Sequence, residues 1–466
     1  MTELSVTTTP IPGLLVVRLP VHADARGWFK ENWQRTVMSG LGLPEGFTPV
    51  QHNVAFNARR GTTRGFHAEP WDKMVSLATG RAFGAWVDLR EGDGFGTVVH
   101  ADLDPSVAVF VPRGVGNSYQ TLEDDTAYSY LVTQHWSPGA QYAAVDLADP
   151  TLAVSWPIPL HDAIVSDKDL AQPSLPDVTP MPRRRVLITG ATGQLANALA
   201  AAIPDATSVA VEDLDITDAA AVAAWPWTDY DVVLNAAAWT DVDAAETIDG
   251  RVGAWRVNAQ GPAHLARAAV QHGLVLVHYS TDYVFDGVRA EHTEDEPLSP
   301  LGVYGQSKAA GELAVSTAPQ CYVLRTAWLV GDGHNFVRTM MDLAGRGVSP
   351  SVVDDQVGRL TFADELARAT VHLLDSRAPF GTYHCTNAGD PISWADVARD
   401  VFERCGRSAG DVRPVSTADY SAGKTLAPRP VRSVLDLAKL EATGFHPESA
   451  PVALGRYVDR LLSSPA

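Results

Sequence analysis

The spacing of hydrophobic positions changes near residue 180, so the chain divides into two unlike halves. Before that point, short apolar runs of β type alternate with Gly, Pro and Asp at intervals typical of a sandwich or a barrel. These runs cover residues 14–19, 74–77, 83–89, 107–111 and 127–132. The first half is therefore predicted to be all β.

In the second half, apolar strands alternate with helical patterns. Strands are predicted at the apolar end of residues 183–189, at 208–211, at 232–235 and at 275–279, and helices at 194–202 and around 263–269. This βαβ rhythm predicts a parallel, doubly wound sheet of Rossmann type. Residues 172–183 hold four prolines, which is typical of a linker. We therefore predict one domain at 1–171 and a second at 184–466.

The composition favours a globular enzyme over a nucleic-acid or membrane protein. A chain of 466 residues with 45% hydrophobic residues is long enough for two cores. The net charge of −19 argues against nucleic acid or an anionic membrane as a partner. The Thr/Pro-rich N-terminus and the short apolar runs predict neither a signal peptide nor a membrane span.

The cysteines and the possible metal ligands are sparse. Cys321, Cys385 and Cys405 lack metal or redox spacing, which suits a reducing cytosol. We find no His, Asp and Glu set with ligand spacing, so no metal is predicted. The predicted location is the cytoplasm.

A glycine-rich turn follows the first strand of the second half. Gly190, Thr192 and Gly193 form a tight turn, and Gln194 and Leu195 open an Ala/Leu-rich helix. Glycines let backbone N–H groups approach a pyrophosphate, which the helix N-terminus also favours. This pattern predicts a nicotinamide dinucleotide site, and the alternative is a β–α turn that binds nothing.

The choice between NADH and NADPH depends on the end of the next strand. Residues 208–211 are predicted to end it at Glu212 and Asp213. A carboxylate there suits a ribose 2′-hydroxyl and disfavours a 2′-phosphate. We therefore expect NADPH or NADH as coenzyme, with NADH at least usable.

Tyr304 and Lys308 are the strongest catalytic candidates. Four residues apart on a helix, they lie on one face. An ammonium beside the phenol is expected to lower the pKa of Tyr304 from about 10 toward the working range. A Tyr-x-x-x-Lys pair alone is weak evidence, but here it follows a nucleotide-binding turn and the Ser-Thr-Asp strand end at 280–282.

These motifs, taken in order, give the second half a family resemblance. It resembles dTDP-4-dehydrorhamnose reductase, an extended short-chain dehydrogenase/reductase, through the segments at 189–195, 215–217, 235–240, 280–287, 304–308, 325–328 and 354–358. The resemblance implies that Tyr304 donates a proton, Thr281 shares the reacting oxygen and Lys308 binds the coenzyme. It also implies sugar contacts for Asp282, Tyr283 and Trp328, and a coenzyme site made of Gly190, Thr192, Gly193, Gln194, Leu195, Asp215, Ile216, Ala236, Ala237, Ala238, Thr240, Tyr304 and Lys308. Some relatives of this fold act instead as cofactor-binding regulatory subunits.

The first half resembles dTDP-4-dehydrorhamnose 3,5-epimerase, a cupin-like β-barrel. The segments at 24–31, 51–53, 64–67 and 166–169 carry the resemblance. It implies a catalytic base at His67, paired with Asp169, and an enolate-stabilising Lys73. It implies substrate contacts for Arg26, Glu31, Gln51, Asn53, Arg64 and, where the family has His, Asn117.

One further departure affects the first half. Trp136 stands where the resemblance places the Tyr that reprotonates the sugar, and an indole does not serve as that acid. His135 or Tyr142 are possible substitutes. The half is then fully active through another donor, active at one carbon only, or a binding module.

Together the halves predict a bifunctional enzyme of dTDP-L-rhamnose biosynthesis. Epimerisation of dTDP-4-keto-6-deoxyglucose would precede NAD(P)H-dependent reduction of the 4-keto group. The expected partner is a deoxythymidine sugar nucleotide, with a homodimer formed through the cupin-like domain. A structural cupin without a ligand would instead fill the space beside His67 with side chains.

Overall fold

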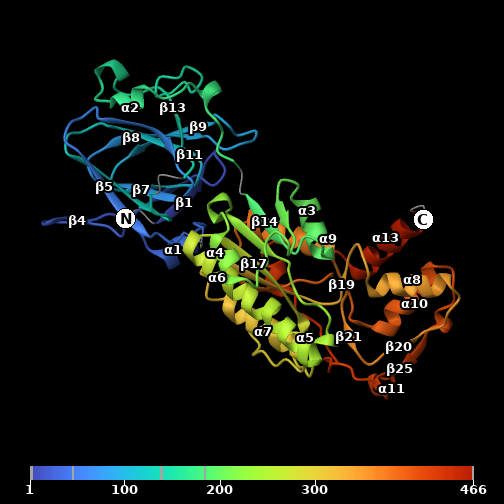
Figure 1. Ribbon diagram of the computed structural model, residues 1–466. Helices are drawn as coiled ribbons and strands as arrows, with labels where there is room; N and C mark the ends of the chain where they lie inside the picture. The colour runs from blue at the N-terminus through green and yellow to red at the C-terminus, as the bar shows by residue number, and fades with distance from the viewer. Residues whose placement is uncertain (1–3, 45–46, 137–139, 183–184, 464–466) are drawn as a thin grey trace. The chain divides into compact units, whose positions relative to one another are not determined.

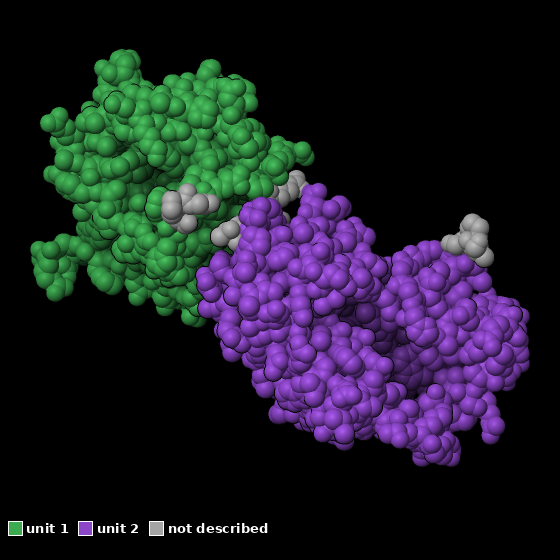
Figure 2. Space-filling view, viewed as in Figure 1, with its two compact units in different colours: residues 1–183 green, residues 184–466 purple. Residues whose placement is uncertain are grey.

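The computed structural model of the protein describes residues 4–44, 47–136, 140–182 and 185–463. The chain forms two compact units, Met1–Arg183 and Arg184–Ala466, coloured separately in Figure 2. Arg183 and Arg184, where the predicted linker ends and the second domain begins, lie outside the described residues.

Unit 1 consists mainly of antiparallel strands, as its alternating pattern predicts (Figure 1). One six-stranded sheet has the order β1-β2-β10-β7-β12-β5, and a five-stranded sheet has the order β13-β6-β11-β8-β9. The elements are β1 (Ser5–Thr8), β2 (Leu15–Arg18), β3 (His22–Asp24), β4 (Gly27–Phe29), α1 (Arg35–Ser39), β5 (Gln51–Asn57), β6 (Thr63–Ala68), β7 (Lys73–Thr79), β8 (Ala82–Asp88), β9 (Val98–Leu103), β10 (Val107–Val111), β11 (Val115–Thr121), β12 (Thr126–Val132), β13 (Ala143–Val145) and α2 (Asp167–Leu170).

The core of unit 1 joins inward-facing side chains of both sheets. Val75, Val109 and Tyr128 of the first sheet pack with Trp86 and Tyr119 of the second. The rings of Tyr119 and Tyr128 stack with centroids 3.9 Å apart. Because side chains alternate across a strand, this stack identifies the interior faces of β11 and β12.

The predicted linker is part of unit 1 as far as it is described. Leu175–Asp177 form a 3₁₀ turn, and Val178 and Met181 are buried in the core beneath the five-stranded sheet. Met181 also accepts a backbone hydrogen bond from Glu91. The prolines therefore shape a packed segment rather than a free connection.

Unit 2 is built on a parallel sheet with the order β15-β14-β16-β17-β18-β23. The chain runs from β14 to β15 on one side and then to β16 on the other, so the sheet has a topological switch point between β14 and β16. The elements of this part are β14 (Val186–Thr189), α3 (Gln194–Ala202), β15 (Thr207–Val209), α4 (Ala219–Ala224), β16 (Val232–Asn235), α5 (Ile248–Trp255), a π-helix (Arg256–Gln260), α6 (Gly261–His272), β17 (Val275–Thr281), α7 (Val303–Val315), β18 (Cys321–Thr326), α9 (Ala363–Asp375) and β23 (Gly381–His384).

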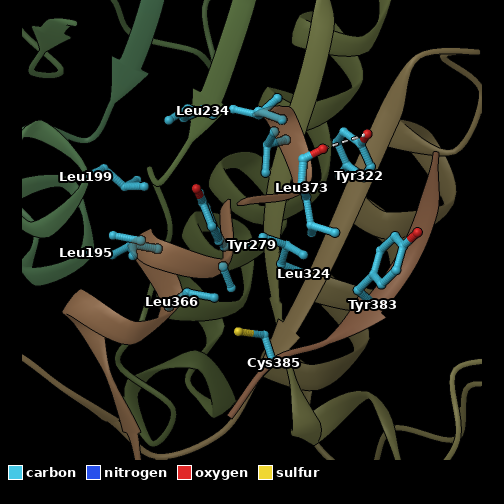
Figure 3. Packing of buried hydrophobic residues seen from close by; sticks show 14 of the residues in the cluster. Leu195, Leu199, Leu234, Tyr279, Tyr322, Leu324, Leu366, Leu373, Tyr383 and Cys385 are labelled. Carbon is cyan, nitrogen blue, oxygen red and sulfur yellow. Dashed lines mark hydrogen bonds between the residues drawn. The ribbon is translucent and has the colours of Figure 1, made fainter. Parts of the chain in front are cut away.

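Helices cover both faces of this sheet. On one face, Leu195 and Leu199 of α3 and Leu366 and Leu373 of α9 pack on the strands (Figure 3). On the other, the core includes Leu265 of α6 and further residues of α4 and α7. Burial on both faces explains the nearly continuous apolar runs of these strands.

A smaller lobe completes unit 2 around its own core, which includes Met340 and Phe402. It contains short strand pairs and several helices. Its elements are β19 (Leu329–Val330), α8 (Phe336–Gly345), β20 (Ser351–Val353), β21 (Val357–Gly358), β22 (Thr361–Phe362), β24 (Ile392–Ser393), α10 (Trp394–Arg404), β25 (Arg413–Val415), α11 (Thr417–Ser421) and α13 (Ala450–Ser463). The short helix α12 (Ala438–Glu441) packs instead on the parallel sheet through Leu440. Across the described parts of both units, no helix combines the length and apolarity that crossing a membrane requires.

Candidate active sites

In unit 2, a cavity of about 800 Å³ opens at the carboxyl ends of β14, β16 and β17. In Figure 2 the purple surface is hollowed in the region of β19. Every residue predicted for the coenzyme site lines this cavity, as do Thr281, Asp282 and Trp328. The switch point of the sheet therefore coincides with the site that the motifs predict.

Gly190 determines the shape of the nucleotide turn. Its φ is +75°, and a Cβ there would lie 2.7 Å from the backbone nitrogen of Ala237. Only glycine allows both the left-handed backbone and this close approach. The turn after β14 therefore meets the Ala236–Ala238 segment after β16, which fits a dinucleotide with its pyrophosphate at the N-terminus of α3.

The end of β15 and the position of Asp213 after it differ from the prediction. The strand ends at Val209, earlier than expected, because residues 211–213 form a turn. Asp213 Oδ2 accepts a hydrogen bond from Ala210 N at 3.0 Å, so this carboxylate stabilises its own turn. Glu212 lines the cavity, whereas Asp213 is not among the described residues that line it.

The catalytic candidates of unit 2 meet where β17 ends. Thr281 Oγ1 donates to Asp282 Oδ1 at 2.9 Å, and a hydrogen bond links Thr281 to Tyr304. Burial raises the pKa of Asp282 to about 6, against hydrogen bonds from Ser433 and Thr281. Asp282 and Thr281 thus form a polar chain that ends at the Tyr304 hydroxyl.

The expected lowering of the Tyr304 pKa is wrong for this structure. Burial, with the Asp282 carboxylate adding to it, raises the pKa of Tyr304 to about 12. Lys308 does not offset this, and its Nζ donates to the backbone oxygen of Tyr279 at 2.5 Å. Burial also lowers the pKa of Lys308 to about 8, opposed by the Glu312 carboxylate.

Tyr283 and Trp328 take different positions. Tyr283 is not among the described residues that line the cavity; its ring packs edge-on against Tyr304, with centroids 5.8 Å apart. Trp328 lines the cavity with a left-handed backbone, φ +46°, and stacks on Trp394 at 3.7 Å. The structure therefore brings Trp328 to the site and places Tyr283 behind Tyr304.

In unit 1, His67 and Asp169 form the predicted pair. His67 Nε2 lies 2.8 Å from Asp169 Oδ1. Burial alone would raise the pKa of Asp169. Hydrogen bonds from Gly65 N and Ser166, together with the nearby His67, outweigh burial and keep this pKa below its usual value. A Cβ on Gly65 would lie 2.6 Å from Asp169 Oδ1, so a glycine is required for this approach.

A bulge in β6 brings Arg64 to the face that carries His67. On β11, Asn117 pairs with His67 and Tyr119 pairs with Arg64, so two steps on β11 match three on β6. Asn117 and Tyr119 share the interior face, and their partners therefore share it too. Lys73 is also buried there, with its Nζ 3.4 Å from the His67 carbonyl oxygen and in an ion pair with Glu69.

The remaining predicted contacts of unit 1 fall into two groups. Gln51 and Asn53 lie on β5, hydrogen-bonded to each other at 2.8 Å, and Asn53 pairs with Tyr130 of β12. Arg26 and Glu31 instead lie on and beside the exposed β3–β4 hairpin, where Arg26 forms an ion pair with Asp24. Within the described part of this unit, the structure does not bring the hairpin residues to His67.

Trp136 does not occupy the interior, and Tyr130 does. The Trp136 side chain is 65% exposed and follows the end of β12. Tyr130 lies two residues after Tyr128 on the interior face, and burial and Glu69 raise its pKa while Arg64 opposes them. Sequence reasoning missed Tyr130, although its i, i+2 spacing from Tyr128 on one strand was a usable signal.

Comparisons with known proteins assign each unit to a family. The model of the family described as dTDP-4-dehydrorhamnose 3,5-epimerase matches residues 8–177, and that of the RmlD substrate binding domain matches residues 184–463. The chain is 48% identical to a protein named RmlC homolog from Streptococcus pyogenes serotype M6, over 37% of this chain and 89% of that protein. The chain belongs to both families.

Two further relatives match the RmlD half. The dTDP-4-dehydrorhamnose reductase of Mycobacterium tuberculosis is 42% identical, over 56% of this chain and 88% of its own length. The crystal structure of a Bacillus anthracis dTDP-4-dehydrorhamnose reductase in complex with NADP is 34% identical, with a TM-score of 0.56, over 60% of this chain and 99% of that one. The resemblances and the fold class predicted from sequence are confirmed.

Sequence reasoning also missed a loop at the mouth of the RmlD-type cavity. Gln194 Nε2 donates to His334 O at 2.9 Å, and its Oε1 accepts from Gly331 N at 2.8 Å. Asp332, Gly333 and His334 line the cavity. A residue of the nucleotide turn thus holds a loop that lies 137 and 140 positions further along the chain.

Proposed function

We propose that the chain is a bifunctional enzyme that epimerises dTDP-4-keto-6-deoxyglucose at C3 and C5 and then reduces the 4-keto group with NAD(P)H. Epimerisation is assigned to unit 1 and reduction to unit 2. The observation that carries this proposal is that each unit holds a complete polar constellation for its own step. These are His67, Asp169, Lys73 and Tyr130 in one, and Thr281, Tyr304 and Lys308 in the other.

In the epimerisation, His67 is the base. Its Nε2 faces Asp169, which leaves Nδ1 for the proton beside the ketone. The Lys73 ammonium stabilises the oxygen of the enolate that forms. Tyr130 returns a proton from the six-stranded sheet, across the interior from the five-stranded sheet that carries His67. This assignment replaces the acid that Trp136 does not supply.

In the reduction, Tyr304 is the proton donor. Its raised pKa keeps the phenol protonated at neutral pH, the form that a donor needs. Thr281 hydrogen-bonds the same oxygen, and Lys308 binds the ribose of the coenzyme. The nicotinamide supplies the hydride when bound, and the cradle of Gly190 and Ala236–Ala238 fits its dinucleotide.

A homodimer through unit 1 is supported by the edge strand β5, the last strand of its sheet. Val54 and Phe56 on β5 are 60% and 62% exposed, and Phe29 on the hairpin is 64% exposed. An exposed apolar edge of this kind favours pairing with a second copy. In such a dimer Arg26 and Glu31 would serve the partner's site. The location we propose is the cytoplasm.

The test is incubation of the full chain with dTDP-4-keto-6-deoxyglucose and NADPH or NADH, with stereochemical analysis of the product. Formation of dTDP-L-rhamnose supports both steps. Reduction without inversion would leave unit 1 as a binding module, and coenzyme binding without turnover would identify a regulatory protein.

A further inference from the structure

A line of buried charged groups runs behind the coenzyme cavity. Tyr304, Lys308 and Glu312 follow one another at intervals of four on α7 and so share one face of the helix. Arg325, on β18, donates through Nε to both Glu312 oxygens at 3.1 Å and through Nη2 to Oε2 at 2.8 Å. Lys308, Glu312 and Arg325 are only 3%, 3% and 4% exposed.

This arrangement places the Lys308 ammonium one helical turn from a carboxylate that is already ion-paired with Arg325. Burying an ammonium disfavours its charged form, whereas an opposite charge nearby favours it. In agreement with this, burial lowers the pKa of Lys308 to about 8 and Glu312 acts in the opposite sense. Arg325 already donates to both oxygens of Glu312. Its positive charge therefore reduces the stabilisation that the carboxylate gives to the Lys308 ammonium.

The other titratable groups nearby do not replace Glu312. On β17, burial and the Lys308 charge hold the pKa of His278 well below its usual value, so this ring is neutral. On α7, Tyr304 is protonated. Beside Arg325, burial lowers the pKa of His384 to about 3, and Glu294 accepts a hydrogen bond from the His384 backbone. Among the described residues, Glu312 is the one anionic group whose charge supports the Lys308 ammonium.

We propose that Glu312 is a positioning residue for the reduction, whose carboxylate keeps the Lys308 ammonium charged in its buried place, and that Arg325 sets the strength of this effect. The inference rests on the proposed role of Lys308 at the coenzyme ribose. It extends the Tyr304–Lys308 pair to a four-residue line that spans α7 and β18.

Opposite shifts in pH dependence follow from this arrangement. Glu312→Gln removes the anion and leaves the ammonium without support, so Lys308 loses its proton at lower pH. Arg325→Met removes the competing cation, so Lys308 keeps its proton to higher pH. A purely structural role of the ion pair would weaken both variants in the same way.

The experiment measures the dissociation constant of NADPH, by quenching of protein fluorescence, and the reduction rate between pH 6 and pH 10. In the unsubstituted protein, NADPH affinity and the reduction rate should both fall above about pH 8, and this fall is the alkaline limb of the pH profile. In Glu312→Gln this limb should move down by about one pH unit, which makes NADPH binding roughly fivefold weaker at pH 8 and close to tenfold weaker at higher pH. In Arg325→Met it should move up.

Matched controls separate a local effect from a general one. Glu365 on α9 is also buried, 2% exposed, and forms an ion pair with Arg368 at 2.6 Å. Glu365→Gln should leave the pH limb in place. The double variant Glu312→Gln/Arg325→Met removes both members of the buried ion pair, so neither is left without its partner, and it should fold and show a lowered limb even where a single variant does not fold.

The outcomes are distinguishable from a failure of the proposed function. The inference about Glu312 is overturned by an unchanged limb in folded Glu312→Gln or in the double variant, or by a limb that moves down in folded Arg325→Met. A Lys308→Met variant that keeps both NADPH affinity and the alkaline limb overturns instead the role of Lys308 itself.

Discussion

Asn117 on β11 lies directly opposite His67 on β6, and its Oδ1 accepts hydrogen bonds from Trp86 Nε1 and the Tyr128 hydroxyl, both at 2.9 Å. The side chain that stands in place of a family histidine is therefore fixed by two buried aromatic residues beside the base. Its amide group is held toward the interior face on which His67, Arg64 and Tyr130 lie.

Tyr130→Phe should lower the rate of inversion by ~10²–10⁴-fold, because the phenol provides the returning proton. Exchange of the sugar protons in deuterated water should persist, since His67 is intact. Mass spectrometry of the recovered substrate and NMR of the product measure the two effects.

Three further variants test this prediction. His67→Ala should abolish exchange as well as inversion, whereas Tyr304→Phe should leave exchange unchanged. Trp136→Phe, at an exposed position, should leave inversion nearly normal. A large loss of inversion in Trp136→Phe with normal Tyr130→Phe would transfer the donor role away from Tyr130.

Tyr304→Phe should abolish reduction and leave NADPH affinity nearly intact, because the hydroxyl acts on the substrate oxygen. Lys308→Ala should weaken both, because the ammonium binds the coenzyme. Stopped-flow absorbance at the NADPH band and equilibrium titration measure these quantities. Near-normal turnover of the Phe variant would exclude Tyr304 from proton transfer.

Glu212→Gln should shift the coenzyme preference toward NADPH, because Glu212 lines the cavity and its charge repels a 2′-phosphate. Asp213→Asn is the matched control: its carboxylate caps Ala210 N, so it should leave the preference unchanged. The ratio of kcat/KM for NADH and NADPH gives the answer. Equal ratios in the Gln variant and the unsubstituted protein would show that Glu212 does not meet the ribose.

Asp282→Asn should reveal how burial of this carboxyl affects stability with pH. The folded pKa of about 6 lies above the ordinary 3.8, so ionisation costs stability as the pH rises from about 4 through 6. The neutral Asn should therefore gain up to about 3 kcal/mol relative to Asp between pH 4 and pH 7.5. Thermal unfolding, with the unit 2 transition identified by its shift on adding NADPH, measures the difference.

An exposed residue controls for general charge effects in that experiment. Asp295→Asn, at an exposed position, should change stability by a similar small amount at both pH values. A pH-independent difference for Asp282→Asn as well would show that its carboxyl is solvated in the native protein.

Phe56→Lys should prevent association through the β5 edge, because it buries a charge at an apolar contact. Light scattering should report a dimer for the unsubstituted protein and a monomer for the variant. Val252→Lys, at an exposed position on α5 in unit 2, should leave the dimer intact. A monomeric unsubstituted protein would refute the dimer.

Local patterns in the sequence were enough for much of the fold and for the coenzyme site. Alternating apolar runs predicted strands such as β10 with their observed bounds, and the helix at Gln194–Ala202 was predicted to the residue. The nucleotide turn was predictable because a φ of +75° at Gly190 and a helix N-terminus are properties of adjacent residues.

Only the tertiary structure decided which side chains meet across the chain. The bulge that brings Arg64 beside His67 depends on pairing with β11, and Tyr130 became a candidate donor only once β12 was placed against Asn53 and Val75. Asp213 turned from the ribose to cap Ala210, and Lys308 gained a Glu312 carboxylate shared with Arg325 on another strand. Periodicity specifies which face a residue takes, but pKa values and partners depend on burial and on charges from distant segments, which no local pattern contains.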